Sequence, residues 1–392
     1  MPCMDPVVSS TRAAPGPPAE GVGPIVWMAG TSWDGVPGTD KRLVMELARL
    51  RRVVWVDPPR RVSPRDLRQR PAPEEVHPGV TRVQVLAPPA ATRALVRGWT
   101  SRLLQRAVAA AVAGPEPASA VVVAHPYARF PRGGGVTRVL YSTDDWIAGA
   151  PLMGFSARHL RAVLTANVRE ADLVLGVSPP ILESLQRLAP ARASVVLPNG
   201  APDLSTARLD GAARAGAILV GQLNARLDAR LLRLVADAGV DLTVVGPVVG
   251  DEACRAQFDQ LFAHPRVTGL GLVSPAEVAQ RLSRAAVGLT PYRDDGFNRA
   301  SFPLKTLEYL AAGLPVVSTD LPASRWLNTS HVAVATSDDD FVRLARQASE
   351  GDGGGEQERV ALAHSHSWGR RAERLLELVD GVASTAASSG TR

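Results

Sequence analysis

Short apolar runs alternate with longer amphipathic segments over most of the chain. Each apolar run predicts a buried β-strand. The longer segments place apolar residues at helical spacing, as at Leu43, Leu47 and Leu50, and predict amphipathic helices. Up to residue 200, strands are predicted at 24–29, 52–59, 80–89, 118–126, 137–145, 172–178 and 193–200, and helices at 40–50, 92–113, 156–171 and 181–188.

The same alternation restarts after residues 201–215, which are small and polar and typical of an interdomain linker. Strands are then predicted at 216–222, 240–247, 266–271, 286–292 and 314–320, and helices at 227–239, 252–263, 275–285, 303–313 and 367–382. Strands that alternate with helices form βαβ units and largely parallel sheets. We therefore expect an α/β protein with two Rossmann-like domains facing each other across a cleft.

This pattern divides the chain into five parts. Residues 1–22 and 384–392 are rich in small residues and are expected to be disordered. The first domain is expected at 23–203 and the second at 204–366. A closing helix is expected at 367–383.

Composition narrows the class of protein. The chain has 392 residues, enough for two domains, and its 45% hydrophobic and 21% charged residues are typical of a globular protein. Two cysteines exclude a disulfide scaffold and a multi-cysteine zinc site. No apolar run is long enough for a membrane helix, and no secretory signal is evident. We expect a protein of the bacterial cytoplasm or of the inner face of the membrane.

The charge is basic but dispersed. The formal net charge is +6, and no block of like charges resembles a nucleic-acid-binding arm, so nucleic acid is the least favoured partner. Residues 60–70 form an arginine-rich stretch, which could lie on anionic lipid or form a solvated loop. Its arginines are Arg60, Arg61, Arg65, Arg68 and Arg70. Only Lys41 and Lys305 are lysines, which draws attention to both.

One of these lysines begins the most informative segment. Lys305 and Glu308 fall in the first turns of the helix predicted at 303–313. A helix N-terminus favours an anion, and Lys305 adds a full positive charge there. The Glu308 carboxylate can accept hydrogen bonds from two hydroxyls. A phosphate beside a vicinal diol is the ribose–diphosphate part of a nucleotide.

Residues 298–320 resemble the donor-binding helix of the GT-B glycosyltransferases of family 4, the glycosyl transferases group 1. That family carries a Glu-x7-Glu motif followed by Ala-x-Gly-x-Pro-Val-Val. The variant in this chain, Pro-x-Lys-x-x-Glu-Tyr-Leu-Ala-Ala-Gly-x-Pro-Val-Val, is similar to a subgroup that includes teichuronic-acid-type transferases of cell-surface polysaccharides. The resemblance implies a GT-B fold in which the last helix, from Trp368, crosses back onto the first domain.

The resemblance also implies roles for single residues. Glu308 matches the second motif glutamate, which binds the ribose hydroxyls of the donor. The turn that approaches the diphosphate and the sugar matches Ser301, Phe302, Pro303 and Leu304. Proline has no N–H, so one amide of this turn is missing. The first motif glutamate is replaced by Ala300, which leaves Asn298, Arg299 or Asp295 to hold the donor sugar.

A second loop supports the donor site. Residues 220–226 resemble the family's glycine loop with a basic residue facing the diphosphate, which places Gly221 and Arg226 there. Arginine can bind a phosphate through two parallel hydrogen bonds. The alternative is that Arg226 is a solvated arginine on a turn. Residues 198–200, Pro-Asn-Gly, resemble the family's hinge between the domains.

Acceptor candidates follow the strands of the first domain. Trp33 and Asp34 lie in a glycine-rich loop after the first strand, and Asp145 follows the fifth. His125 and Asp144 could accept the proton of an acceptor hydroxyl. The alternatives are a packed loop histidine at 125 and a helix N-cap at 144 or 145. The family resemblance implies no metal.

Together these features predict a glycosyltransferase. It would move a sugar from a nucleotide-diphosphate sugar to a hydroxyl acceptor, which could be a glycan, a lipid-linked glycan or a small molecule. The resemblance implies retention of anomeric configuration, and no cofactor beyond the nucleotide sugar itself. Arg226 and Lys305 would stabilise the leaving diphosphate. The alternatives are a GT-B nucleotide-sugar epimerase and a binding protein without turnover.

Overall fold

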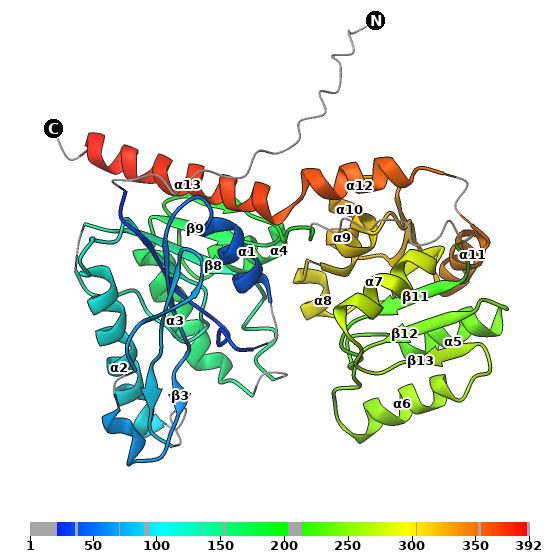
Figure 1. Cartoon of the computed structure of the whole chain (residues 1–392), viewed down its shortest axis with the longest axis horizontal. Helices are drawn as coiled ribbons and strands as arrows, with labels where there is room; N and C mark the ends of the chain where they lie inside the picture. Colours follow the sequence, from blue (N-terminus) through cyan, green and yellow to red (C-terminus); the bar gives the residue numbers. More distant parts are fainter. Residues whose placement is uncertain are drawn as a thin grey trace, which may run out of the picture.

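The structure is a computed structural model of the chain. It describes residues 22–35, 38–69, 71–89, 94–133, 135–151, 154–202, 214–302, 304–351 and 354–389. Two α/β domains lie side by side, and a long C-terminal helix runs along the first of them (Figure 1). This arrangement confirms the predicted fold class.

The first domain is built on a mostly parallel sheet. In spatial order its strands are β10 (Ser194–Val196), β9 (Leu173–Gly176), β8 (Thr137–Ser142), β7 (Ala120–Val123), β1 (Ile25–Met28), β2 (Val53–Val56), β5 (Val80–Val83) and β4 (Glu74–His77). Only the edge strand β4 is antiparallel among the pairings of this sheet within the described chain. Central strands such as β1, β7 and β9 are buried throughout, as expected when helices cover both faces of a parallel sheet.

Helices and a small ribbon complete the first domain. The helices are α1 (Thr39–Leu47), α2 (Ala94–Val112), α3 (Ala157–Glu170) and α4 (Pro179–Gln186). A two-stranded parallel ribbon joins β3 (Arg60–Arg61) to β6 (Leu86–Ala87), and the 3-10 turn η1 (Asp66–Arg68) lies between them in sequence.

The second domain is built on a fully parallel sheet. In spatial order its strands are β13 (Val267–Gly269), β12 (Leu242–Val245), β11 (Ala217–Val220), β14 (Val287–Thr290), β15 (Val316–Thr319) and β16 (Val332–Ala335). Its helices are α5 (Ala229–Asp237), α6 (Glu252–Phe262), α7 (Pro275–Arg284), α8 (Gly296–Ala300), α9 (Leu304–Ala311), α10 (Pro322–Trp326), α11 (Asp338–Ser349) and α12 (Glu356–Ser365). Asp228, Asp251, Ser274 and Asp295 begin α5 to α8 by accepting a backbone N–H of the first turn.

The closing helix α13 (Trp368–Ser389) packs on α1 and β8 of the first domain. Ser367 forms a β-bridge with Ala201, so the chain passes between the domains twice at this point. The prediction of a disordered tail from residue 384 is wrong as far as Ser389. There the alanines favour helix, and the Ser384 and Thr385 hydroxyls bond to the carbonyls of Asp380 and Gly381.

Most predicted strands and helices agree with the structure. The strands and helices predicted from the sequence are present with shifted ends, and the strand predicted at 80–89 divides into β5 and β6. The sequence pattern missed β4, whose EEVH sequence is polar at a sheet edge. It also missed β3, α8 and every element from α10 to α12. Residues 1–21, 203–213 and 390–392, which include most of the predicted linker, lie outside the described residues.

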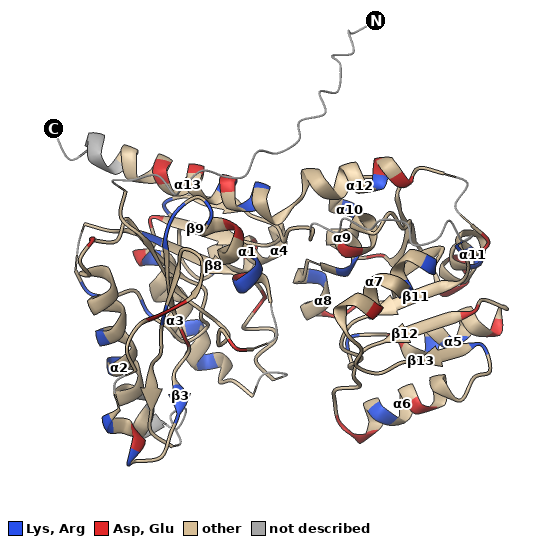
Figure 2. Cartoon of the chain, in the orientation of Figure 1, with Lys and Arg blue, Asp and Glu red and all other residues tan. Residues whose placement is uncertain are grey.

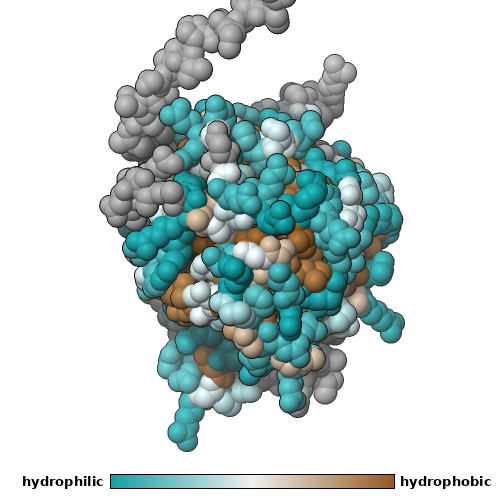
Figure 3. Space-filling view, turned by 90° about the vertical axis from the view of Figure 1, so that its right-hand side faces the viewer, coloured by the Kyte–Doolittle hydropathy of each residue, from teal (hydrophilic) through white to brown (hydrophobic). Residues whose placement is uncertain are grey.

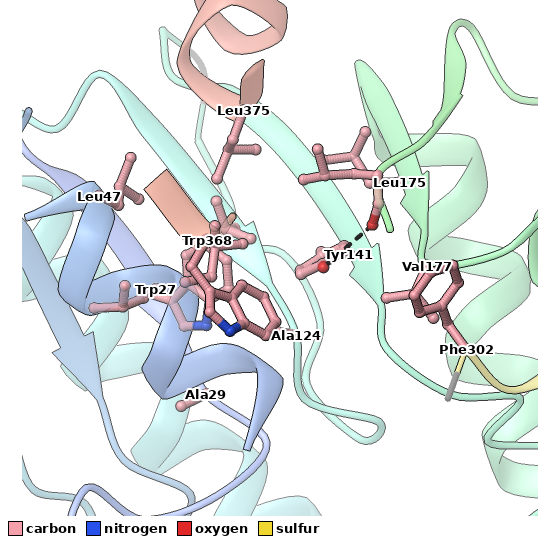
Figure 4. Packing of buried hydrophobic residues seen from close by; sticks show 14 of the residues in the cluster. Trp27, Ala29, Leu47, Ala124, Tyr141, Leu175, Val177, Phe302, Trp368 and Leu375 are labelled. Atoms are coloured by element: carbon pink, nitrogen blue, oxygen red, sulfur yellow. Dashed lines mark hydrogen bonds between the residues drawn. The ribbon is translucent and has the colours of Figure 1, made fainter. Parts of the chain in front are cut away.

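One apolar core crosses the boundary between the domains. It joins the strands of the first domain to Phe302 and Leu307 of the second and to Trp368 and Leu375 of the closing helix. Figure 4 shows this packing, with the Tyr141 hydroxyl donating a hydrogen bond to the Leu197 carbonyl. A separate core fills the far side of the second domain. No helix in the described part of the chain is long and apolar enough to cross a membrane.

The tight crossing of the closing helix gives a stability prediction. A Cβ atom at Gly200 would lie 2.6 Å from Cδ2 and 2.7 Å from the backbone nitrogen of Trp368. Gly200→Ala should therefore lower the free energy of unfolding by about 1–3 kcal/mol, a typical cost of overpacking. Urea denaturation followed by circular dichroism measures this change.

A matched control lies on the same helix. Gly381 of α13 is exposed, and a Cβ there meets nothing within 4 Å. Gly381→Ala should raise the free energy of unfolding by roughly 0.5–1 kcal/mol, because alanine favours helix over glycine. Equal unfolding midpoints for the two variants would contradict this account of the crossing.

Candidate functional site

A cavity of about 730 Å³ lies between the two domains. Its walls come from loops after β1, β7 and β8 of the first domain and after β11 and β14 of the second, together with the start of α9. These are carboxyl ends of parallel strands, where ligands of such sheets bind. The volume suits a ligand of nucleotide-sugar size.

The donor candidates on α9 meet in this cavity. Lys305 and Glu308 both line it, and Lys305 Nζ donates to Glu308 Oε2 at 2.5 Å. The second oxygen, Oε1, accepts from Arg42 Nη1 of the first domain at 3.0 Å. Arg42 was not predicted from the sequence, because no local pattern distinguishes it from the other arginines. Glu308 thus carries one cation on each carboxylate oxygen.

Arg226 is held at the cavity wall by the loop before α9. Its Nε donates to Asn298 Oδ1 at 2.8 Å and its Nη2 to Ser301 Oγ at 3.1 Å. Its guanidinium lies 4.7 Å from the ring centroid of Phe297 and 5.4 Å from that of Tyr292. Arg226 is therefore not a freely solvated arginine, and it lines the cavity.

The substitutes predicted for the missing motif glutamate serve other purposes. Asn298 is buried and positions Arg226, Asp295 caps α8, and Arg299 pairs with the exposed Asp294. None of the three predicted substitutes lines the cavity. The prediction that one of them holds the donor sugar has no support in this geometry.

The turn before α9 is fastened to the first domain. Ser178 Oγ donates to the Ala300 carbonyl at 2.5 Å, and Asn199 Nδ2 donates to the Phe302 carbonyl at 3.2 Å. Ser301, Phe302 and Leu304 line the cavity as expected, while Pro303 lies outside the described residues. Ser178 occupies the N-cap of α4, but its side chain makes no capping bond there.

Gly221 lies where the glycine loop meets α9. It lines the cavity with φ +149°, and a Cβ atom at this residue would lie 3.3 Å from Cε of Lys305. The absence of a side chain therefore leaves room for the Lys305 side chain to pass. The predicted glycine loop is thus part of the cavity.

Two carboxyl groups line the opposite wall. Burial raises the pKa of Asp144 to about 6, although the charge of Arg226 and a hydrogen bond from Thr143 lower it. Burial also raises the pKa of Asp40 to about 7, and the charge of Asp144 adds to this. Asp40 Oδ2 accepts the Gly30 N–H at 2.9 Å. Sequence analysis missed Asp40, although its place after the glycine-rich loop was a usable signal.

The other acceptor candidates lie elsewhere. Trp33 is 7% exposed and packs at 79° against Trp55, and the Asp34 carboxylate bonds to Arg82 at 2.7 Å. Asp145 accepts two backbone N–H groups of the turn that follows it. Trp33, Asp34 and Asp145 do not line the interdomain cavity. Ring packing, an ion pair and backbone hydrogen bonds hold these three side chains. The position of a residue after a predicted strand does not show such contacts.

His125 also does not line the cavity, although its neighbours Ala124 and Pro126 do. Its Nδ1 accepts the Tyr127 N–H at 3.0 Å, and burial lowers its pKa to about 4. The ring is therefore neutral near pH 7. This placement supports the alternative of a packed loop histidine. Among the described residues, no cluster of three or more His, Cys, Asp or Glu could hold a metal ion.

Parts of this chain are similar in sequence to known proteins. Residues 217–350 match the family model of glycosyl transferases group 1. TuaH of Bacillus subtilis (strain 168), named as a glycosyltransferase of teichuronic acid biosynthesis, is 31% identical over 177 residues. That match covers 43% of this chain and 43% of TuaH, so less than half of each protein is compared.

Solved structures resemble the chain over most of its length. Sucrose-phosphate synthase from Thermosynechococcus elongatus aligns with a TM-score of 0.69 and 17% identity, over 93% of this chain and 100% of the other. The trehalose 6-phosphate synthase of Burkholderia multivorans aligns with a TM-score of 0.67 and 12% identity, over 95% and 99%. At these identities the likeness concerns the fold. The chain therefore has the GT-B glycosyltransferase fold, and its residues 217–350 match the glycosyl transferases group 1 model.

Proposed function

We propose that this protein is a glycosyltransferase that moves a sugar from a nucleotide-diphosphate sugar to a hydroxyl acceptor. One observation carries the proposal. Arg226, Lys305 and Glu308 converge on one interdomain cavity at the start of α9, inside the matched group 1 domain. Two cations and a helix N-terminus suit a diphosphate, and the carboxylate suits the ribose beside it.

The donor would lie mainly against the second domain. Glu308 would accept the ribose hydroxyls, while Arg226 and Lys305 bind the diphosphate. The base would rest on the apolar rim formed by Leu272 and Val273, which line the cavity. Leu272 is 84% exposed, and an aromatic base would cover part of its side chain.

The reaction breaks the bond between the anomeric carbon and the diphosphate oxygen. The electron pair goes to the diphosphate, and the sugar becomes oxocarbenium-like. Arg226 and Lys305 would stabilise the charge on the leaving group without a metal ion. The acceptor oxygen would then bond to the anomeric carbon. An ionised Asp144 would stabilise the positive sugar and accept the proton that the acceptor hydroxyl loses. The family resemblance supports retention of the anomeric configuration of the transferred sugar as part of this proposal.

The acceptor would enter from the first domain. The first-domain wall of the cavity, which includes Thr31 and Asp144, offers hydroxyl, carboxyl and backbone groups that suit a sugar. The relation to TuaH supports a cell-surface polysaccharide or its lipid-linked precursor as the acceptor class. A lipid-linked acceptor would require the protein to lie at a membrane surface.

Arginines of β3 in the first domain, blue in Figure 2, support such a contact. The side chains of Arg60, Arg61, Arg65 and Arg68 have no ion-pair or hydrogen-bond partner among the described residues, and Arg70 lies outside them. Their ribbon packs through β6 against α2, whose Trp99 is 49% exposed. Exposed arginines and an exposed tryptophan on elements that pack together suit an anionic bilayer surface.

The donor site gives the first functional prediction. We expect one of UDP, GDP, ADP and TDP to raise the melting temperature equally with magnesium and with EDTA, because a ligand of the native state stabilises it. Glu308→Ala should weaken that nucleotide's binding by about 10- to 100-fold, since hydrogen bonds to charged groups contribute about 1.5–3 kcal/mol. Isothermal titration calorimetry measures the affinity.

Glu377→Ala is a suitable control, because Glu377 pairs with Arg374 on the exposed face of α13. It should bind the nucleotide as the wild type does. Unchanged affinity in a folded Glu308→Ala variant would refute the assignment of Glu308. Nucleotide binding without transfer to any acceptor would favour the binding-protein alternative.

Asp144 gives a pH prediction. A carboxyl group with a pKa near 6 is ionised above that pH and protonated below it. The stabilising negative charge is therefore present at pH 7 to 8, and kcat/KM should fall as the pH drops through about 6. Asp144→Asn should lower the rate by roughly 100-fold or more and remove this acid limb. A wild-type rate that stays constant from pH 8 to 5 would contradict the role.

The membrane contact is tested with vesicles. The protein should sediment with phosphatidylglycerol vesicles and not with phosphatidylcholine vesicles, and 0.5 M salt should release it. Reversing the charge of both Arg60 and Arg61 should weaken binding more than tenfold, at about 1 kcal/mol per arginine. The same reversal of Arg343 and Arg346 on α11 should have little effect. Equal loss in both double variants would argue against a specific surface.

A further inference from the structure

We propose that Arg42 of the first domain completes the nucleotide site of the second by holding the Glu308 carboxylate in its binding orientation. The inference rests on the proposed function, because it assigns Glu308 to the ribose hydroxyls. It makes Arg42 a positioning residue, which acts on the nucleotide through Glu308. The nucleotide site then belongs to both domains.

The contact joins residues that are 266 positions apart in the sequence. Arg42 lies on α1 and Glu308 on α9, and both side chains line the interdomain cavity. The Arg42 side chain is 30% exposed and that of Glu308 is 13% exposed. The pair is therefore partly shielded from solvent, where an ion pair is stronger than on an open surface.

Arg42 and Lys305 together determine how the carboxylate is presented. Each binds a different oxygen of Glu308, at 3.0 and 2.5 Å respectively. A carboxylate offers about four lone-pair sites, so acceptor capacity for two hydroxyls remains. A glutamate fixed from both sides loses less side-chain entropy when ribose binds. Lys305 alone would hold only one oxygen.

Arg42 differs in charge from the other first-domain residues that line the cavity. It is the one Lys or Arg that the described part of the first domain contributes to the lining of the cavity. The adjacent Lys41 points elsewhere: its Nζ donates to the Trp33 carbonyl at 2.7 Å and lies 4.6 Å from the Trp33 ring centroid. The two neighbouring cations therefore have separate roles, one inside the first domain and one across the cleft.

The position of α1 against the donor turn does not depend on Arg42. Thr39 Oγ1 donates to Asn199 Oδ1 at 2.9 Å, and Asn199 donates in turn to the Phe302 carbonyl at 3.2 Å. Phe302 is also part of the apolar core shared by the two domains. Removal of the Arg42 side chain should thus leave the domain arrangement in place and release only Glu308.

The test compares a nucleotide with its counterpart that lacks ribose hydroxyls. The probe is whichever of UDP, GDP, ADP and TDP binds the wild type most tightly among those with ribose, together with its 2′,3′-dideoxy form. Arg42→Ala should weaken binding of the ribonucleotide roughly tenfold and leave the dideoxy form within about twofold, as for one charge-assisted hydrogen bond lost. The double variant Arg42→Ala/Glu308→Ala should bind like Glu308→Ala alone.

Arg49→Ala is the matched control, because Arg49 follows the same helix and pairs with Glu46 at its surface. Its nucleotide affinity and melting temperature should equal those of the wild type. The ligand-free melting temperature of Arg42→Ala distinguishes lost positioning from a damaged fold. Arg42→Lys should recover part of the lost affinity, since lysine keeps the charge but offers no guanidinium geometry.

Other outcomes would overturn the inference. Equal loss for the ribose and dideoxy nucleotides would show that Arg42 binds phosphate directly. Tighter binding in Arg42→Ala would show that Arg42 competes with ribose for Glu308. Unchanged affinity would show that the ion pair has no role in binding. A wild-type protein that binds none of the nucleotides would refute the proposed function itself, and the inference with it.

Discussion

Apolar packing across the domain boundary is the constraint on which the rest of this structure depends. Phe302 and Leu307 of the second domain belong to the same buried core as the strands of the first and as Trp368 of the closing helix. This packing presses the turn before α9 against the first domain, where Ser178 and Asn199 bind its carbonyls. The donor turn is thus oriented by the opposite domain, and the cavity has a defined width.

Charge is concentrated where this packing brings the two walls together. Arg42, Arg226 and Lys305 line the cavity with Asp40, Asp144 and Glu308. Such groups are costly to bury unless paired or hydrogen-bonded. Glu308 pairs with Arg42 across the cleft and with Lys305 on its own helix, while Arg226 and Asp40 are held by hydrogen bonds to neutral groups. A diphosphate would meet the cations, and a sugar with developing positive charge would meet the carboxyl wall. The outer face of the second domain, by contrast, is mostly hydrophilic with scattered apolar patches (Figure 3).

Sequence reasoning succeeded where the signal was local. The start of α9 could be predicted from its apolar period, and Lys305, Glu308 and Gly221 from a short motif; all three line the cavity. At strand ends of the first domain the outcome was mixed, because Asp144 lines the cavity but the other strand-end candidates do not. Trp33 and His125 follow strands as ligand-binding residues do, yet one packs against Trp55 and the other accepts a backbone N–H. The direction of a loop side chain depends on neighbours that are distant in sequence.

The amino-acid sequence was sufficient to predict the two-domain α/β architecture and the donor helix. Apolar periodicity and helix starts depend on residues that are close together in the sequence. The sequence was not sufficient for the composition of the site. Arg42 is one of many arginines until folding sets it 3.0 Å from Glu308, and Asp40 acquires its raised pKa only by burial. Contacts between residues hundreds of positions apart, and the loss of water around a charge, arise only when the domains close on each other.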